Sequence, residues 1–247
     1  MPETASESPR ILFFADIDST NAEARRMAEA GERGPLWITA LRQHAGRGRR
    51  GRAWETGAGD NLAATYLFTS TLAPAQAAQI SFVAALAVAD LIDAFSRERA
   101  SLKWPNDPLI AGRKAAGILV ESGSVGEGAL WLAVGCGVKL AKAPAAADRP
   151  AAALADHMDG PPPTPREALL FLAPAMESWR KVWEASGFPP IAEAWTRRAH
   201  GLGGPCLAQL SSETVRGIAE GLDPDGALRL RLATGEVRRI TAGDVFF

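Results

Sequence analysis

The chain has 247 residues, of which 47% are hydrophobic and 22% are charged, and its formal net charge at pH 7 is −1. These values fit one soluble domain, or one domain with a small appendage, and they supply enough apolar residues for a core. A protein that coats nucleic acid is usually basic overall, so the balanced charge argues against that class.

The first predicted elements are a tail, a strand and a helix. Residues 1–10 are polar and lack the apolar stretch of a signal peptide, so they are predicted to be a disordered tail. The apolar run 11–17 predicts a buried strand. Thr20 and Glu23 have the spacing of a capping box, and Gly31 suits the end of a helix, so a helix is predicted to begin at Ser19 or Thr20.

Strands and one long helix are predicted for the next part of the chain. Residues 36–43 predict a strand that runs directly into "GRGRRGR" at 46–52. Residues 61–68 predict a further strand, and the apolar segment 75–98 predicts a buried helix. No run is judged to approach the ~20 apolar residues of a membrane span, so no contact with a membrane is expected.

A hairpin and a glycine-containing strand come next. The hairpin is predicted to turn at Ala111-Gly112, and residues 129–140 predict a strand with two glycines near its end. Alanine occupies nine of the fifteen positions 141–155, and "GPPPTP" follows. We therefore expect 141–163 to be a loop with at most one helical turn.

The last third is predicted to be two helices and a small β domain. Residues 165–187 have helical spacing, and Pro174 should kink or break that helix. Helix continues to about residue 200. From 205 onward, short alternating segments separated by turn residues predict about five strands, which should pack on the main body because so small a unit is marginal alone.

The "GRGRRGR" stretch, followed by Trp54, allows three interpretations. Its glycines let backbone N–H groups approach an anion, and its arginines bind carboxylate or phosphate through two points. Trp54 offers a flat face for a base. A small-anion site, a nucleic-acid contact and a solvated basic loop are all compatible with this stretch alone.

A second segment, "LKWPNDPLIAGRKAAG", places charges on apolar strands. Lys103 and Lys114 would be costly to bury unless each meets an anion, although a lysine can also extend its ammonium to solvent. Asn106 and Asp107 follow a strand end, where such a pair can hold Mg²⁺ beside a phosphate or can simply form a turn.

Other residue types exclude several kinds of site. The chain has no P-loop motif, and the literal G-x-G-x-x-G match inside "GRGRRG" opens no helix. His44, His157 and His200 lack metal-ligand spacing and a nucleophile, so they are interpreted as structural or surface residues. Cys136 and Cys206 predict no disulfide framework and fit a reducing compartment.

Taken together, the segments "STN" (19–21), "QHAGRGRRGRAW" (43–54), "KWPND" (103–107), "GRKAAGILVE" (112–121) and "GCGVK" (135–139) resemble those of biotin protein ligases, in order and in spacing. The resemblance covers about residues 11–247. It implies an α+β fold with a mixed, largely antiparallel sheet flanked by helices, which lipoate ligases share, followed by a small SH3-like β-barrel. The implied domains are a catalytic domain at 11–203 and the barrel at 204–247.

The resemblance also implies an activity. Biotin would react with ATP to give biotinyl-5′-AMP and pyrophosphate, with Mg²⁺ as activator, and a lysine of a biotin carboxyl carrier domain would then take the biotin. A cytoplasmic enzyme and a possible homodimer are expected. Because only about ten residues precede the first strand, the DNA-binding domain of some relatives is not expected. A lipoate or octanoate ligase of the same fold, or a nucleic-acid-binding module, are the alternatives.

Residue roles are likewise implied by the resemblance. The expected catalytic residues are Arg49, Lys114 and Asp107, with no metal held by protein side chains. The expected biotin-binding residues are Ser19, Thr20, Asn21, Gln43, Gly46, Arg47, Arg49, Lys114 and Gly117. The expected ATP- or adenylate-binding residues are Arg47, Arg49, Arg50, Trp54, Lys103, Asn106, Lys114 and Lys139.

Two of these positions raise questions. The family usually has asparagine where this chain has Lys139, so the lysine either reaches the adenylate phosphate or points away. Asp107 could serve as the base that deprotonates the incoming lysine, but an ordinary carboxylate with a pKa near ~4 is a poor base. An electrostatic or structural role is therefore preferred for Asp107.

Overall fold

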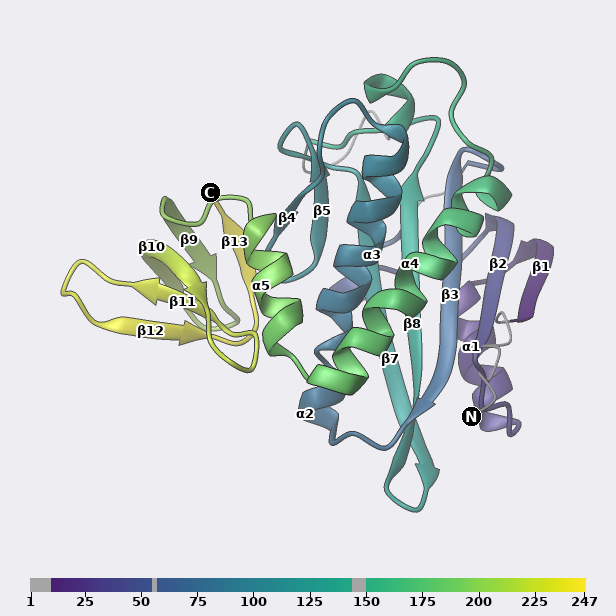
Figure 1. The fold of residues 1–247 in the computed structure, drawn as a ribbon, viewed down its shortest axis with the longest axis horizontal. Helices are drawn as coiled ribbons and strands as arrows, with labels where there is room; N and C mark the ends of the chain where they lie inside the picture. The colour runs from purple at the N-terminus through teal and green to yellow at the C-terminus, as the bar shows by residue number, and fades with distance from the viewer. Residues whose placement is uncertain (1–9, 55–56, 144–149) are drawn as a thin grey trace, which may run out of the picture.

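The computed structural model describes residues 10–54, 57–143 and 150–247, so most of the predicted tail at 1–10 lies outside it. A larger α+β part carries the N-terminal four fifths of the chain, and a small β part carries the C-terminus (Figure 1). The main sheet has the order β1-β2-β3-β8-β7. Its strands are β1 (Arg10–Ile17), β2 (Leu36–Gln43), β3 (Asn61–Ser70), β7 (Ala116–Gly126) and β8 (Ala129–Lys139).

Only β1 and β2 pair in parallel, and the other neighbours in this sheet are antiparallel. This arrangement confirms the predicted mixed, largely antiparallel sheet. The strand ends also match the predicted ones within a few residues, because the runs of β-branched and apolar residues end at glycine and polar turn residues.

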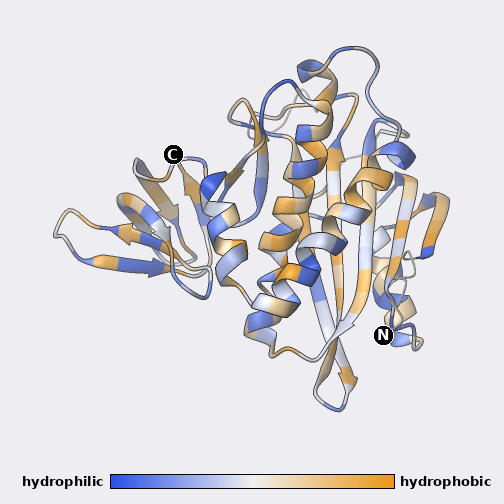
Figure 2. Ribbon diagram, in the orientation of Figure 1, coloured by the Kyte–Doolittle hydropathy of each residue, from blue (hydrophilic) through white to orange (hydrophobic). Residues whose placement is uncertain are grey.

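Helices cover the two faces of the sheet unequally. α3 (Ile80–Phe95) and α4 (Pro165–Ser186) pack on one face, and α1 (Thr20–Glu29) packs on the other (Figure 1). The alternation along β2 shows this, since Trp37 joins the cluster of α3 while Leu36 and Ile38 join the cluster of α1. Apolar residues accordingly concentrate in the central strands and in α3 (Figure 2).

Ser19, one of the two predicted caps, is the N-cap of α1, and its hydroxyl accepts from Ala22 N. One other helix prediction needs correction. The predicted helix 75–98 is divided into α2 (Pro74–Ala77) and α3. α4 runs through Pro174 without a break, and a Thr164–Glu167 capping box starts it. The prediction that residues 141–163 hold at most one helical turn is confirmed for the described residues by the short 3₁₀ turn Leu154–His157.

The segment Pro74–Phe95 is apolar and long enough, by length and composition, to cross a membrane. This corrects the expectation that no run approaches such a length. In the fold, 61% of that apolar window is buried inside the protein. Its longer helix, α3, is largely buried in the core of the larger part.

A small sheet joins β4 (Ser101–Lys103), β5 (Asp107–Ile110) and β6 (Arg113–Lys114). Its predicted turn is confirmed, since Ala111 and Gly112 both have positive φ, 49° and 72°. The turn brings Lys114 back beside the strand that carries Asp107.

The C-terminal strands form a separate antiparallel sheet. After α5 (Pro189–Arg197) come β9 (Pro205–Gln209), β10 (Thr214–Leu222), β11 (Leu228–Arg231), β12 (Val237–Ile240) and β13 (Asp244–Phe246), in the order β12-β11-β10-β9-β13. Five strands confirm the predicted small β unit. The buried Trp104 Nε1 donates to Gly226 O at 2.9 Å, so this sheet packs on the main body as expected.

Candidate ligand-binding and catalytic site

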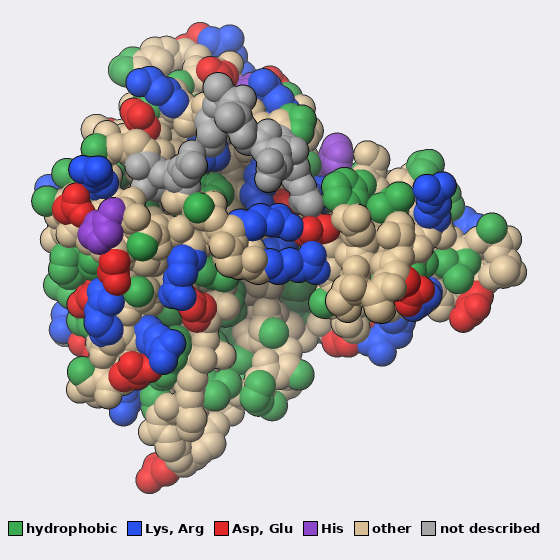
Figure 3. Space-filling view, turned by 180° about the vertical axis from the view of Figure 1, so that it is seen from behind, with side chains coloured by type: hydrophobic (Ala, Val, Ile, Leu, Met, Phe, Trp, Pro, Cys, Tyr) green, Lys and Arg blue, Asp and Glu red, His purple; other side chains and the backbone are tan. Residues whose placement is uncertain are grey.

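A cavity of about 610 Å³ opens on the α1 face of the main sheet. The N-terminus of α1, the 46–54 loop, β7 and β8 surround it. Ten of the predicted site residues line it: Ser19, Thr20, Asn21, Gln43, Arg47, Arg49, Trp54, Lys114, Gly117 and Lys139. Seen from behind, Lys and Arg side chains gather between the larger part and the C-terminal strands (Figure 3).

One end of the cavity is polar but neutral. Thr20 donates to Gln43 Oε1 from its backbone N at 2.8 Å and from its hydroxyl at 3.0 Å. The fully buried Thr65 hydroxyl lies 2.8 Å from Thr20 Oγ1 and 2.7 Å from Asn21 Oδ1. Sequence analysis missed Thr65, because one threonine in an apolar strand carries no signal until α1 packs over it.

The amide of Asn21 is held on both sides. Its Nδ2 donates to Leu119 O at 3.2 Å and to Glu121 Oε2 at 2.8 Å. Its Oδ1 lies so close to Gly135 that an added Cβ there would be 2.2 Å away. Glu121 was quoted in a motif but not assigned a role, and it is the second site residue that sequence analysis missed.

The floor of the cavity is made of glycine. Gly117 and Gly137 face each other across β7 and β8. The Trp54 indole rests on both, since an added Cβ would lie 2.7 Å and 2.5 Å from its ring, respectively. Lys139 Nζ lies 4.4 Å from the centre of the same ring, so it faces the cavity in a cation–π contact.

The other end of the cavity is cationic and surrounds one carboxylate. Asp107 is 2% exposed, and it pairs with Lys114 and, at 3.1 Å, with Lys103. Burial raises the pKa of Asp107, but the two lysines and Arg49 outweigh burial and hold that pKa below its usual range. The structure therefore brings the two predicted lysines and the predicted carboxylate into one cluster.

The charged form of Lys114 is disfavoured by its surroundings. Burial lowers its pKa first, and the nearby Arg49 and Lys103 charges lower it further, against the opposing effect of Asp107. A buried cation beside other cations binds an added anion strongly, because that anion relieves repulsion as well as supplying attraction. Lys114 and Arg49, which both line the cavity, are the groups placed to do this.

The cationic loop is a narrow hairpin. Arg47 and Ala53 form a bridge, Gly48 N donates to Arg52 O at 2.7 Å, and Trp54 N donates to Gly46 O at 2.9 Å. An added Cβ on Gly46 would lie 2.4 Å from Trp54 O, so only glycine permits this closure. The hairpin lines the cavity, and its return strand places Trp54 on the glycine floor of the cavity.

Arg50 lies outside the lining of the cavity. Its φ is 58°, and Nη1 lies 3.2 Å from Asp244 Oδ2 of β13. Arg52 also binds this carboxylate, at 2.6 Å. The structure thus directs Arg50 to the C-terminal sheet, and its predicted contact with the nucleotide remains a prediction. The role of Asp244 was not foreseen, because its partners are almost 200 positions away in sequence.

Asn106 and Lys103, like Gly46 and Asp107, lie behind the lining and not on it. Asn106 is buried, and its Oδ1 has no hydrogen-bond partner among the described residues. An unpaired buried amide oxygen is costly, so it is a candidate acceptor for a ligand or water.

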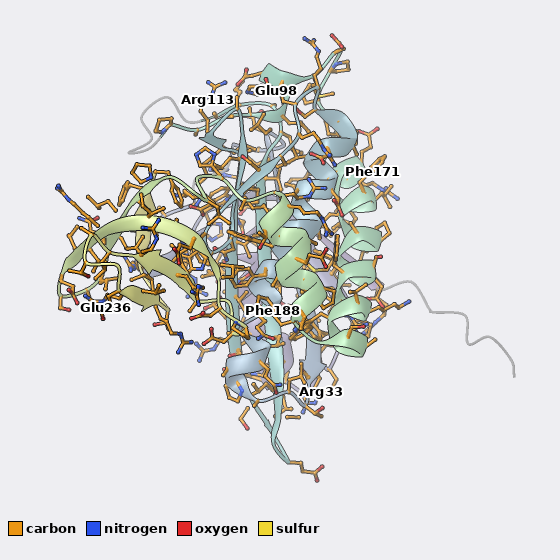
Figure 4. All side chains as sticks on the ribbon, turned by 60° about the vertical axis from the view of Figure 1, so that its left-hand side comes forward. Arg33, Glu98, Arg113, Phe171, Phe188 and Glu236 are labelled. Carbon is orange, nitrogen blue, oxygen red and sulfur yellow. The ribbon has the colours of Figure 1, made fainter. Side chains whose placement is uncertain are left out.

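The histidines lie away from the cavity. His157 is buried, with Nδ1 2.9 Å from Glu98 Oε1 and Nε2 2.9 Å from Arg113 Nη2. Arg113 and Glu98 lie at the same end of the molecule (Figure 4). His44 is exposed beside Asp16. Within the described ranges, no group of three His, Cys, Asp or Glu side chains could hold a metal ion.

The cavity thus has a neutral polar end at Thr20, Asn21 and Gln43 and a cationic end at Lys114 and Arg49. The profile of the Biotin/lipoate A/B protein ligase family matches residues 13–139, and that of the Biotin protein ligase C terminal domain matches residues 201–247. The chain belongs to the biotin/lipoate A/B protein ligase family. This membership confirms the resemblance found in the sequence.

Individual relatives agree. The chain is 44% identical to the biotin–[acetyl-CoA-carboxylase] ligase of Paracoccus denitrificans over 95% of this chain and 99% of that one. The biotin protein ligase of Aquifex aeolicus in complex with biotin and ATP has the same fold, with a TM-score of 0.79, 24% identity and coverage of 96% and 97%. The biotin protein ligase of Leishmania major in complex with biotinyl-5-AMP also has this fold, with a TM-score of 0.60 and 25% identity. The match covers 95% of this chain and 99% of that one.

Proposed function

We propose that this protein is a biotin protein ligase, which converts biotin and ATP to biotinyl-5′-AMP and pyrophosphate and then biotinylates a lysine of a biotin carboxyl carrier domain. The observation that carries the proposal is the 44% identity to the Paracoccus enzyme over nearly the full length of both chains. The two chemically different ends of the cavity support it.

The neutral end suits the head of biotin. A ureido ring carries N–H donors and a carbonyl acceptor but no charge, so it needs neutral partners in a confined slot. Thr20, Gln43 and Asn21 offer such partners, and Ser19 lies beside them on the helix cap. Gly117 also lines the cavity, and its missing side chain makes room there for the Trp54 indole.

The cationic end suits the reacting groups. In the first step a carboxylate oxygen attacks the α-phosphorus and pyrophosphate leaves, so two anions must approach each other. Lys114 and Arg49 neutralise that repulsion and the charge that develops as the new bond forms. Asp107 holds Lys114 in place through their ion pair, and the Arg49 charge is near enough to act on the same carboxylate.

Asp107 serves this end electrostatically. In the second step a lysine amine of the carrier attacks the mixed anhydride and AMP leaves, and the amine must lose a proton. A carboxylate whose pKa is lowered and which two lysines occupy is a weak acceptor for that proton. We therefore assign Asp107 to positioning Lys103 and Lys114.

The nucleotide is placed against Trp54. The indole presents a ring for adenine, and Lys139 is close enough to the same ring to reach an adenylate phosphate. Asn106 Oδ1 is a candidate acceptor near the nucleotide. ATP would enter as its Mg²⁺ complex, with the metal acting as the activator that the resemblance implies.

The remaining assignments extend the proposal. Residues 11–203 form the catalytic domain, and residues 204–247 form an SH3-like barrel. The enzyme acts in the cytoplasm and does not bind nucleic acid. It can form a homodimer. The carrier domain belongs to a biotin-dependent carboxylase. The matched family ranges support the two domains, the name of the Paracoccus relative supports the carboxylase substrate, and the balanced charge supports the absence of nucleic-acid binding. The location and the homodimer are inferred from the resemblance alone.

Pyrophosphate release tests the proposal. The purified protein is incubated with Mg²⁺-ATP and either biotin, lipoate or octanoate, and then with a carrier domain whose target lysine is intact or replaced by arginine. Release with biotin, followed by labelling of the intact carrier alone, is expected. Release with lipoate or octanoate only would move the protein to the other branch of the family, and sequence-selective DNA binding at physiological salt would add a function that we do not expect.

A further inference from the structure

We propose that Glu121 is a positioning residue that closes the neutral end of the cavity over the biotin head, by holding Arg47 of the loop and Asn21 of α1 at once. This inference rests on the proposed function and adds a residue to it. It also changes the expected role of Arg47. In place of binding the ligand's carboxylate, Arg47 acts as a strap, by which we mean that its ion pair with Glu121 holds the loop closed over the ligand.

Glu121 stands where three elements meet. It follows Gly117 and Leu119 at alternate positions of β7, so it shares their face of the sheet, which is the face of the cavity. Its Oε2 accepts from Asn21 Nδ2 at 2.8 Å, and Arg47 Nη2 lies 3.1 and 3.2 Å from its two oxygens. One carboxylate therefore connects the strand, the helix N-terminus and the loop.

The contact fixes what Asn21 can offer a ligand. Both amide hydrogens are used, one by Leu119 O and one by Glu121, and Oδ1 accepts from the Thr65 hydroxyl. An amide oxygen has two acceptor sites, so one remains for a ligand N–H. Asn21 can thus accept but not donate, which selects a ligand head that carries N–H groups, as a ureido ring does.

The same contact settles where Arg47 lies. The Arg47 side chain is 45% exposed, and the Glu121 side chain, which is 25% exposed, balances its charge at the neutral end of the cavity. Lys114 and Arg49 remain as the cations of the other end. An arginine held in this way closes the rim above the ligand head without meeting the ligand's carboxylate.

A binding experiment without ATP separates the two roles of Arg47. Wild type and Arg47→Ala are titrated with biotin and with biotinol, in which an alcohol replaces the carboxylate. If Arg47 holds the loop closed, the affinity of the variant should fall about fivefold for both ligands. This factor is expected because a partly exposed ion pair contributes of the order of 1 kcal/mol. A loss for biotin alone would show that Arg47 binds the carboxylate and would overturn the proposal. Because Arg47 lies in an exposed loop, the variant should fold.

Steady-state kinetics test Glu121 itself. We expect Glu121→Gln to raise the KM for biotin about fivefold to tenfold, with kcat at saturating biotin and the KM for ATP changed less than twofold. Combining it with Arg47→Ala should add little further loss, because each change breaks the same contact. Glu127→Gln, in the exposed β7–β8 turn, is the matched control. Glu121→Asp, which keeps the charge, should recover part of the affinity.

The outcomes are distinguishable. An unchanged biotin KM, equal increases for biotin and ATP, or full additivity with Arg47→Ala would each refute the role of Glu121 while leaving the ligase activity of the wild type intact. Absence of biotin-dependent pyrophosphate release by the wild type would instead refute the proposed function. If Glu121→Gln does not fold, the biotin–biotinol comparison on Arg47→Ala decides the matter.

Discussion

At the cationic end of the site, Asp107 carries the negative charge that balances Lys103 and Lys114. Among the ion pairs of the described residues, these two lysines have no other carboxylate partner. Such a cluster is costly to assemble, because all three groups lose water when the chain folds. The cost makes sense if the cations are needed for an anionic substrate. Function and stability then depend on the same few side chains, and they can be separated by choosing which one to replace.

Lys114→Ala should cripple adenylate formation. The variant loses the ammonium that faces the cavity but keeps the Lys103–Asp107 pair, so the fold should survive. We expect biotin-dependent pyrophosphate release to fall by about a hundredfold or more, as when one electrostatic contact to a transition state is removed. Lys181→Ala, an exposed lysine of α4, is the control. Near-normal release by Lys114→Ala would contradict the assigned role.

Asp107→Asn should reveal the ion pairs through the pH dependence of stability. The folded-state pKa of Asp107 lies below the ordinary value of 3.8, so its ionised form stabilises the fold above that value and the contribution is lost as pH falls through the lower folded-state pKa. Urea unfolding at pH 7 should show a loss of about 3 kcal/mol for the variant. The difference from wild type should shrink towards zero in acid.

The exposed Asp159 supplies the control for that measurement. Asp159→Asn should change the free energy of unfolding by less than about 0.5 kcal/mol at either pH. If the Asp107→Asn deficit were the same in acid as at pH 7, steric disruption and not lost charge would explain it.

Single residues also show what sequence could and could not predict. Lys103, Lys114 and Asp107 were identifiable because charges on apolar strands demand partners. Thr65 and Glu121 were not, since their partners Thr20, Asn21 and Arg47 come from other elements. The sequence left Ser19 and Thr20 as alternative caps, and packing decides between them, because the Thr20 hydroxyl bonds to Gln43 and Ser19 caps the helix.

At the scale of elements, alternation and turn residues predicted most strands, and tertiary packing decided the helix boundaries. The segment 75–98 is uniformly apolar, so its composition hides the interruption between α2 and α3. Pro174 lies within a helix that packs along α3, and this packing maintains the helix despite the lost backbone hydrogen bond. The two glycines of β8 can be explained only from the tertiary structure, in which Gly135 lies against Asn21 and Gly137 lies under Trp54.

Gly137→Ala should displace Trp54. The new Cβ would lie 2.5 Å from the indole, in the middle of a paired strand that cannot yield, so the ring must move. Because Trp54 is expected to face adenine, we predict that the KM for ATP rises about tenfold, in keeping with the loss of one stacking contact. Steady-state kinetics at saturating biotin measure this value.

A second glycine provides the reference. An added Cβ at Gly204 would come no closer than 3.4 Å, to Gly201 O, so Gly204→Ala should leave the KM for ATP unchanged. An unaltered KM in Gly137→Ala would mean that Trp54 does not need its place on the floor to bind the nucleotide.

For the whole molecule, the C-terminal sheet is tied to the active-site loop by one carboxylate. Asp244 is buried and pairs with Arg50 and Arg52 of the hairpin, which also presents Arg49 and Arg52 to the cavity. The five C-terminal strands could be predicted from their turns, but this pairing could not, because it depends on how the two parts dock. It offers a physical reason for the small sheet to accompany the catalytic part.

Asp244→Asn should loosen the loop without unfolding either part. The variant keeps the shape of the side chain but removes the charge that opposes two arginines, so the hairpin should open more often and retain biotinyl-AMP less well. We expect release of the intermediate to accelerate about tenfold, consistent with the loss of a charge-assisted contact to a buried partner. Labelling of lysines on a bystander protein should rise accordingly. Glu213→Gln, which removes the surface pair with Arg238 inside the same sheet, should change neither quantity. Retention as tight as in wild type, with an unchanged unfolding transition, would show that the sheet does not act on the loop through Asp244.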